Sequence, residues 1–499
     1  MPKMKAIHKE NLLILMLSLL FIPVWFFVYT KAGICGMINP DDITTFQFSI
    51  FGENNLIKKI GNIVKNEPVT PPVLFLIFYF WIKLFGISML AARILACLIS
   101  SFGLFVLGLA AKKIGGTKLS IITVLTAGLS VQTFYMSYQI RSYSLLFFST
   151  SLALLVYITM DGSYRSRILF SFALLLLSYT HFFGILVSFG FITFDIFFDI
   201  IPSRNWKKAI YIIIYIFLFA PYFLAAYYYS KQVWGTFWPP VPNYKDILLI
   251  IKELCSDKWF FFILFMSTFF YYCYCFFPSL LKKDEEKKPI KKKILLCFWV
   301  FFSVLTVVFV YCRYIAPKRS VWVFRYFLCL YPFACIVTAY ALSYIFSYVV
   351  RGYKPYSLQA GIVLLCLFPL YGAMNAKVAI TKPVLITLGS GAEYEKAFEE
   401  LYMQPDILQK DTLVYIHYPQ QYIDGIKILL SKNGIRDLPN LCFEEAEFIS
   451  IFSSFEKNYV IEAPYKLSGT VSSLLKEKQY EFQGAVGSLS YVSSWSKKR

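Results

Sequence analysis

Runs of about 20 consecutive apolar residues recur along the first three quarters of this 499-residue chain. That length lets an α-helix cross a hydrocarbon core about 30 Å thick. A helix also satisfies its own backbone hydrogen bonds where no water is present. The composition agrees, because 58% of the residues are hydrophobic and the mean hydropathy is +0.60. The sequence therefore predicts a polytopic α-helical membrane protein and excludes an ordinary soluble globule.

The basic residues indicate how the chain is threaded through the membrane. Lys and Arg gather in alternate short loops, at 112–118, 165–167 and 204–208, and in the run 282–293. Because cytoplasmic loops carry the excess of basic residues, we expect the N-terminus in the cytoplasm of a multi-pass plasma (inner) membrane protein. The same rule accounts for much of the net charge of +20, so no nucleic-acid partner is predicted. Eleven spans are predicted, at residues 12–30, 86–111, 119–136, 143–160, 167–180, 182–200, 208–228, 259–281, 294–313, 325–349 and 357–373.

Three regions depart from a plain series of spans. The first apolar run is long for a signal peptide and lacks a small-x-small cleavage site, so we expect it to remain as an anchor. Residues 70–86 are apolar and aromatic, but counting them as a span would reverse the sidedness of every later loop. They are predicted to form an amphipathic or re-entrant helix at the outer interface.

The third such region begins after residue 374, where the hydropathy falls and strand and helix patterns alternate. Strands are predicted at 412–417, 458–462 and 488–493, and helices at 393–401, 422–430 and 467–478. This alternation predicts a small α/β domain over residues 375–499, following a transmembrane domain over residues 1–374. The number of preceding spans places this domain outside the cytoplasm.

Arginines inside apolar segments are the strongest functional signal in the sequence. Arg141 and Arg325 both lie within or at the edge of predicted spans, where a charge costs several kcal/mol unless it is paired or hydrated. Lys318 and Arg319 precede Arg325 on the predicted outer side, where basic residues are normally depleted. Guanidinium and ammonium groups bind phosphate well. We therefore predict an anionic substrate; ion pairs within the membrane and lipid headgroups are the alternatives.

Several short motifs, taken in order, resemble those of the GT-C superfamily of membrane glycosyltransferases. That superfamily includes the protein O-mannosyltransferases and the lipid A aminoarabinose transferases. Five motifs of this chain are similar to theirs. They are an acid pair after the first span, a Pro-Pro helix ending in Trp-x-Lys-Leu-Phe-Gly, and segments containing Arg-x-Tyr, Thr-His and Arg-Tyr. The matching residues are Asp41-Asp42, Thr70–Val73, Phe80–Gly86, Ser137–Leu145, Thr180–Gly184 and Arg325–Pro332.

The resemblance implies transfer of a sugar, with inversion, from a polyprenyl-phosphate carrier to an acceptor at the outer face. Asp41 is then the candidate general base, and Asp42 orients the acceptor, the base or a divalent ion; helix capping is the alternative role for both. The resemblance assigns Arg141, Arg325, Lys318 and Arg319 to the donor phosphate. The predicted substrate contacts are Tyr138, Gln139, Tyr143, His181 and Tyr326.

Departures from the family pattern leave several features open. Gln139 and Asp42 both stand where the family has Glu, and Thr70 stands where it has His. No metal ligands are therefore assigned and no cofactor is predicted as required, although a divalent metal ion stays an alternative. A transporter or flippase of a lipid-linked saccharide also fits intramembrane arginines, but no internal repeat is found. An oligosaccharide ligase is a further alternative. The acceptor is not identified; the expected partners are a polyprenyl-phosphate sugar and membrane lipid.

Overall fold

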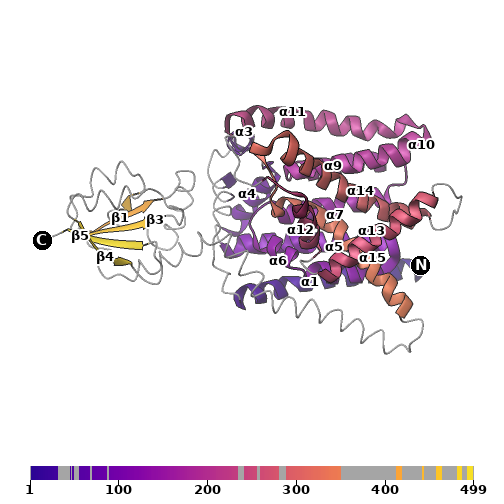
Figure 1. Cartoon of the computed structure of the whole chain (residues 1–499), viewed down its shortest axis with the longest axis horizontal. Helices are drawn as coiled ribbons and strands as arrows, with labels where there is room; N and C mark the ends of the chain where they lie inside the picture. Colours follow the sequence, from indigo (N-terminus) through magenta and orange to yellow (C-terminus); the bar gives the residue numbers. More distant parts are fainter. Residues whose placement is uncertain are drawn as a thin grey trace. The chain divides into compact units, whose positions relative to one another are not determined.

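The chain folds into two compact units. The computed structural model describes residues 2–31, 45, 48–49, 55–67, 70–86, 89–233, 241–255, 259–279 and 288–349, together with five strands between 412 and 497. One unit comprises Met1–Gly33 and Gly52–Lys377 and is helical; the other comprises Ile34–Phe51 and Val378–Arg499 and contains the strands (Figure 1).

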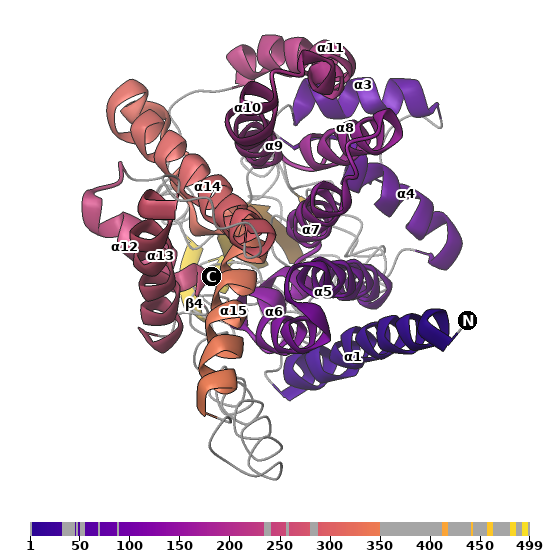
Figure 2. The same cartoon turned by 90° about the vertical axis from the view of Figure 1, so that its right-hand side faces the viewer.

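Long helices make up most of the helical unit, and Figure 2 shows several of them close to end-on. The first half contains α1 (Pro2–Lys31), α3 (Leu56–Asn66), α4 (Val73–Phe85), α5 (Met89–Gly128), α6 (Val131–Tyr138), α7 (Tyr143–Thr159) and α8 (Tyr164–Ser178). The next part contains α9 (Phe182–Asp195), the π-helical turn η1 (Ile196–Ile200), α10 (Ile201–Ser203), η2 (Trp206–Ala209), α11 (Ile210–Val233) and α12 (Tyr244–Leu254). The last part contains α13 (Trp259–Ser279), α14 (Lys288–Val310), η3 (Tyr311–Ile315), η4 (Pro317–Arg319), η5 (Phe324–Leu330) and α15 (Tyr331–Val349).

Each of the first ten predicted spans overlaps one of these helices; the eleventh, 357–373, lies outside the described residues. By length and composition, six helices in the described part can cross a membrane, or seven if the bent pair α6 and α7 is one span. The prediction of a helical membrane protein with several apolar spans is therefore confirmed, whereas the number eleven stays a prediction. The spans predicted at 86–111 and 119–136 include both arms of α5, which is kinked at Gly115 and Gly116. Gly116 has φ 82°, a backbone conformation that favours glycine.

The helix predicted at the outer interface is present as α4. It has 13 residues, fewer than a membrane crossing needs, and Leu84 and Phe85 at its end are exposed. A second short helix, α3, begins at Asn55, whose side chain caps it by accepting from the Ile57 N–H at 2.9 Å. Figure 1 shows α3, α4 and α6 at one end of the helical unit and the N-terminus at the other.

Helices α8 and α9 form a close hairpin. A β-carbon on Gly184, in the first turn of α9, would lie 2.1 Å from the carbonyl oxygen of Leu177 in α8. Only a residue without a side chain allows this approach. The hairpin connection contains His181, so the position of this predicted site residue depends on the close contact.

Gly184→Ala should lower the free energy of unfolding by about 1–3 kcal/mol, because the added methyl group forces the two helices apart. Gly61→Ala in α3 is the matched control, since no atom lies within 4 Å of its added carbon. The control should be neutral or slightly stabilising because alanine favours the helix. Unfolding temperatures of the two detergent-purified variants test this, and equal temperatures would contradict it.

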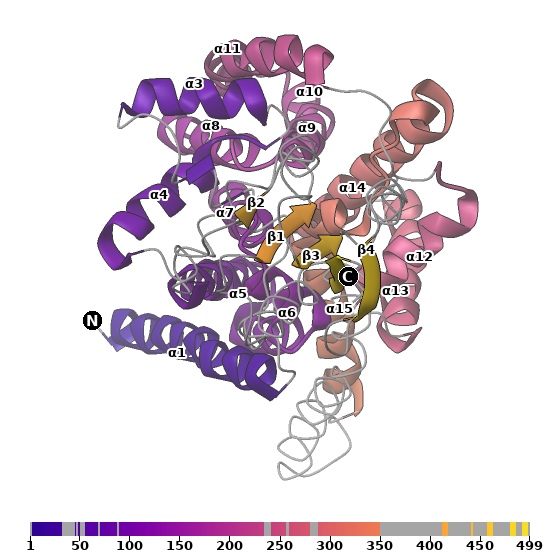
Figure 3. The same cartoon turned by 90° about the vertical axis from the view of Figure 1, so that its left-hand side faces the viewer.

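The second unit contains a five-stranded mixed sheet with the order β2-β1-β3-β5-β4, visible in Figure 3. The strands are β1 (Thr412–His417), β2 (Leu441–Cys442), β3 (Lys457–Glu462), β4 (Tyr480–Ala485) and β5 (Val492–Lys497). β1 pairs in parallel with both β2 and β3, and β5 pairs antiparallel with β3 and β4. β1 and β3 lie where strands were predicted, the last strand begins four residues later than predicted, and β2 and β4 were not predicted. The three helices predicted here lie outside the described residues.

Candidate functional site

The site begins at a break between α6 and α7. Ser130 caps α6, accepting from the Thr133 N–H at 3.3 Å, and α6 ends where Gln139 adopts an extended backbone with ψ 135°. Helix α7 then leaves at 119° to α6. Non-helical backbone within a membrane protein is tolerated where protein or a cavity encloses it. Arg141 lies in this connection, so the bend determines where its guanidinium can reach.

Arg141 forms an ion pair with a residue that the sequence analysis did not select. Its Nη2 atom lies 3.9 Å from Oε1 of Glu67, directly after α3. The Thr70 hydroxyl donates a hydrogen bond to the same Oε1 atom at 3.2 Å. Thr70 is buried, and the side chains of Arg141 and Glu67 are 14% and 25% exposed. The pair therefore joins the loop between α3 and α4 to the connection between α6 and α7.

Arg141 and Arg325 both act electrostatically on His181. Its side chain is 4% exposed, and its Nδ1 atom accepts a hydrogen bond from the Phe183 N–H at 3.2 Å as the cap of α9. Burial, together with the positive charges of Arg141 and Arg325, lowers the pKa of His181 from 6.5 to about 3. The ring is thus neutral near pH 7. Because Nδ1 is the acceptor, we assign the proton to Nε2, which can donate to a ligand.

Aromatic side chains surround His181. The ring centroids of Tyr143 and Tyr326 lie 6.0 and 5.4 Å from its own, and Phe182 stacks on it at 5.0 Å. Arg325 lies over the Tyr326 ring, with its guanidinium carbon 5.8 Å from the centroid. The structure therefore brings together four of the predicted site residues with Arg141. They come from the α6–α7 connection, α7, the α8–α9 hairpin and η5.

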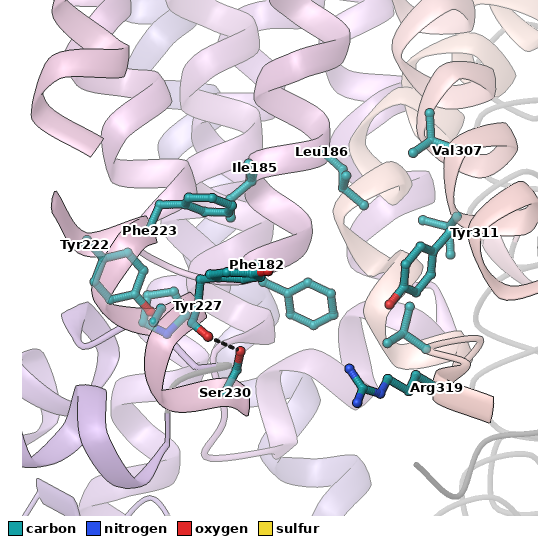
Figure 4. A pocket seen from close by; sticks show the side chains of 14 residues that line it. Phe182, Ile185, Leu186, Tyr222, Phe223, Tyr227, Ser230, Val307, Tyr311 and Arg319 are labelled. Carbon is teal, nitrogen blue, oxygen red and sulfur yellow. Dashed lines mark hydrogen bonds between the residues drawn. The ribbon is translucent and has the colours of Figure 1, made fainter. Parts of the chain in front are cut away.

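A cavity of about 450 Å³ opens next to this cluster (Figure 4). Its walls are largely aliphatic and aromatic side chains of α9, α11 and α14. Phe182, next to His181, and Pro71, next to Thr70, line it on the side of the cluster. Arg319 from η4 also lines it, and Figure 4 shows its guanidinium directed toward the cavity. Most of the lining is apolar, so the cavity suits a ligand with a hydrocarbon part. The lining residues are Pro71, Phe182, Ile185, Leu186, Tyr222, Phe223, Ala226, Tyr227, Ser230, Val307, Val308, Tyr311, Arg319 and Val321.

The remaining predicted residues have different surroundings. Tyr138 is buried beneath the guanidinium of Arg93, whose central carbon lies 3.9 Å from the ring centroid. Gln139 is 2% exposed, and among the described residues its Oε1 atom accepts no hydrogen bond. Buried acceptors usually have a hydrogen-bond donor, and a hydroxyl group of a bound ligand would supply one for this oxygen. Lys318 is exposed at the surface of η4.

The acid pair Asp41-Asp42 lies outside the described residues. Within them, no group of three or more His, Cys, Asp or Glu side chains is arranged to hold a metal ion. Glu67 and Arg93 were missed by sequence reasoning. The spacing Glu67-x-x-Thr70 directly before Pro-Pro was the available signal for Glu67. Arg93 lies inside the predicted span 86–111, so a charge within a span was the signal for it, but its contact with Tyr138 is tertiary.

The pKa of His181 predicts a pH dependence of stability. Unfolded histidine binds a proton near pH 6.5, whereas folded His181 binds one near pH 3. The contribution of His181 is therefore fully present above pH 6.5 and is lost as the pH falls toward 3. His181→Asn keeps a capping acceptor but does not titrate. The unfolding temperature should fall more between pH 7.5 and 5 in the wild type than in this variant; equal falls would contradict the assignment.

Comparisons with known proteins identify solved structures with a similar fold. No protein-family model and no curated protein sequence matches the chain. The chain is similar to the crystal structures of ArnT from Cupriavidus metallidurans, in the apo state with a TM-score of 0.55 and bound to undecaprenyl phosphate with a TM-score of 0.53. Both are 13% identical to it, over 95% of this chain and 97% of theirs. The archaeal oligosaccharyltransferase AglB from Archaeoglobus fulgidus gives a TM-score of 0.48 at 10% identity, over 90% of this chain and 69% of its own. The likeness to ArnT bears out the expected fold: the chain has the fold of these membrane-protein structures.

Proposed function

We propose that this protein is a membrane glycosyltransferase that moves a sugar from a polyprenyl-phosphate carrier to an acceptor at the outer face of the membrane. Arg141 and Arg325 bind the donor phosphate, assisted by Arg319 and Lys318. The acid pair Asp41-Asp42 supplies the base and orients the reacting groups.

The observation that carries this proposal is the convergence of Arg141 and Arg325 on the neutral His181. Both arginines act on this one buried ring, so their guanidinium groups are directed to the same part of the site. A phosphate bound there would meet guanidinium groups and the Nε2–H of His181 as donors. Tyr143 and Tyr326 line the same place and add hydroxyl groups that can contact a sugar. Gln139 adds its buried amide oxygen.

The adjoining cavity supports a lipid carrier. A volume of about 450 Å³ falls within the range of about 300–1,000 Å³ typical of small-molecule pockets, and its walls are mainly apolar. The isoprenoid part of a carrier next to its phosphate would pack between α9, α11 and α14. The similar ArnT structure is described as bound to undecaprenyl phosphate, which fits the same ligand class.

The reaction is a single displacement. The acceptor hydroxyl attacks the anomeric carbon and gives its proton to the carboxylate of Asp41, and the bond from that carbon to the phosphate oxygen breaks. The bonding electrons leave with the lipid phosphate, whose growing negative charge is stabilised by the arginines. Attack from the face opposite the leaving group inverts the anomeric centre. We assign no metal step. The extracytoplasmic C-terminal domain has a scaffold or acceptor-docking role.

Replacing either arginine should weaken the binding of undecaprenyl phosphate. Arg141→Gln and Arg325→Gln each remove a charge-assisted contact of about 1.5–3 kcal/mol. Lys318→Gln is the matched control for a lost charge; because Lys318 is exposed, its effect should be smaller and should vanish at high salt. Titration of the lipid into detergent-purified protein measures all three. Equal, negligible effects would mean that these cations contact only headgroups.

Asp41→Asn tests the chemistry directly. The amide keeps the size and capping ability of the acid but removes the base, so sugar transfer should fall by about two to four orders of magnitude while donor binding persists. The assay is sugar transfer from a synthetic polyprenyl-phosphate sugar by the purified, folded variant. Wild-type turnover would exclude Asp41 from the mechanism. Carrier binding by the wild type without any sugar transfer would favour a transporter.

A further inference from the structure

The segment that carries Arg325 has an unusual backbone. η5 is a 3₁₀-helix over Phe324–Leu330 and continues directly into α15 at Tyr331. Runs of 3₁₀-helix longer than about 3–4 residues are uncommon, because their hydrogen-bond geometry is poorer than that of an α-helix. If η5 relaxed into an α-helix from Tyr331 backward, Arg325 would move by about 3 Å along the axis and rotate by about 120°. The position of Arg325 therefore depends on contacts that hold η5 from outside.

Tyr331 supplies such a contact. Its side chain is fully buried, and its hydroxyl donates to the Oγ atom of Ser130 and also lies 3.2 Å from the carbonyl oxygen of Ala127. Ser130 is the N-cap of α6, so the hydroxyl holds the residue at which that helix begins. The eight residues of α6 span about 12 Å. A helix this short is stiff, so fixing its start also fixes its other end, where the connection with Arg141 begins.

A second hydrogen bond repeats this link between the two segments. Gln132 in α6 donates from Nε2 to the backbone carbonyl of Glu253 in α12. The buried residues of α12 are aliphatic, and α12 packs against η5. The segments that carry Arg141 and Arg325 are therefore joined twice, directly by Tyr331 and indirectly through α12.

We propose that Tyr331 is a positioning residue of the phosphate site: its hydrogen bond to Ser130 fixes the separation of Arg141 and Arg325, so that both guanidinium groups reach one phosphate. This inference rests on the proposed function. It differs from simple stabilisation, because the contribution of the Tyr331 hydroxyl to binding is then conditional on the guanidinium that it positions. A hydroxyl that only stabilises the fold contributes equally with and without Arg325.

The experiment is a double-mutant cycle. Tyr331→Phe removes the hydroxyl and keeps the ring, whose centroid lies 6.0 Å from that of Phe147 in α7. In the full-length, detergent-purified protein it should weaken the binding of undecaprenyl phosphate by about fivefold. In the Arg325→Gln background the same change should have no effect. Ser101→Ala is the matched control, because it removes a buried hydroxyl that donates to the Ser18 carbonyl at 2.8 Å, between α5 and α1, and should leave the affinity unchanged.

An equal loss of affinity in both backgrounds, or no loss in either, would overturn the inference. Ser130→Gly is the second variant, because glycine caps a helix nearly as well as serine but lacks the oxygen that Tyr331 reaches. It should cause the same loss in the wild-type background and none in the Arg325→Gln background. A loss that persists without Arg325 would again mean a purely structural role.

Amide hydrogen exchange tests the positioning without any lipid. Tyr331→Phe should speed exchange in η5 and α6, whereas Ser101→Ala should leave both segments unchanged. Unchanged exchange in η5 and α6 of Tyr331→Phe would overturn the inference. Failure of the proposed function looks different, because the wild type then binds no undecaprenyl phosphate, or Arg325→Gln binds it as the wild type does, whatever the exchange rates show.

Discussion

A helical chain can turn by 119° inside a membrane protein only if its neighbours cover the backbone groups that the turn releases. Here side chains of other helices provide that cover. At the end of α6, the carbonyl of Ser137 accepts from the Cys97 thiol at 3.4 Å and that of Phe134 from the Tyr29 hydroxyl at 3.0 Å. Before α6, at the end of α5, the carbonyls of Ala127 and Gly128 accept from the Tyr331 hydroxyl at 3.2 Å and the Trp25 indole at 3.1 Å. Side chains of α1, α5 and α15 thus hold both ends of α6, the helix that leads to Arg141.

The described part of the molecule contains two clusters of buried charged side chains with different pairing. Near α10, Arg167 lies between Asp195 at 3.2 Å and Asp199 at 2.8 Å, and Lys208 bonds to Asp199 at 2.8 Å. Two cations and two carboxylates balance there, as expected of a network that holds helices together. At the candidate site Arg141 lies 3.9 Å from Glu67 rather than in a close ion pair of this kind, and it lies in the connection that borders His181.

In the proposed function, the apolar cavity holds the hydrocarbon part of the carrier and the charged cluster holds its phosphate. Phe182 belongs to both, because it stacks on His181 and also lines the cavity. A ligand with a hydrocarbon chain and a phosphate can therefore place the chain against apolar side chains and the phosphate against the arginines. The desolvation that keeps His181 neutral comes from the aromatic packing around it.

The sequence alone determined the class of the protein and most helix positions, and it singled out Arg141, Tyr143, His181, Arg325 and Tyr326 as candidates, whose roles stay predictions. These conclusions follow from local patterns, since apolar length identifies a span and a charge inside one is costly wherever the neighbours lie. Only the tertiary structure joined Glu67 to Arg141, placed Arg93 over Tyr138, and showed that the α8–α9 hairpin depends on Gly184. It also corrected the last strand and added β2 and β4. Such contacts join residues from different elements, and no periodicity along the chain specifies which faces of two helices meet.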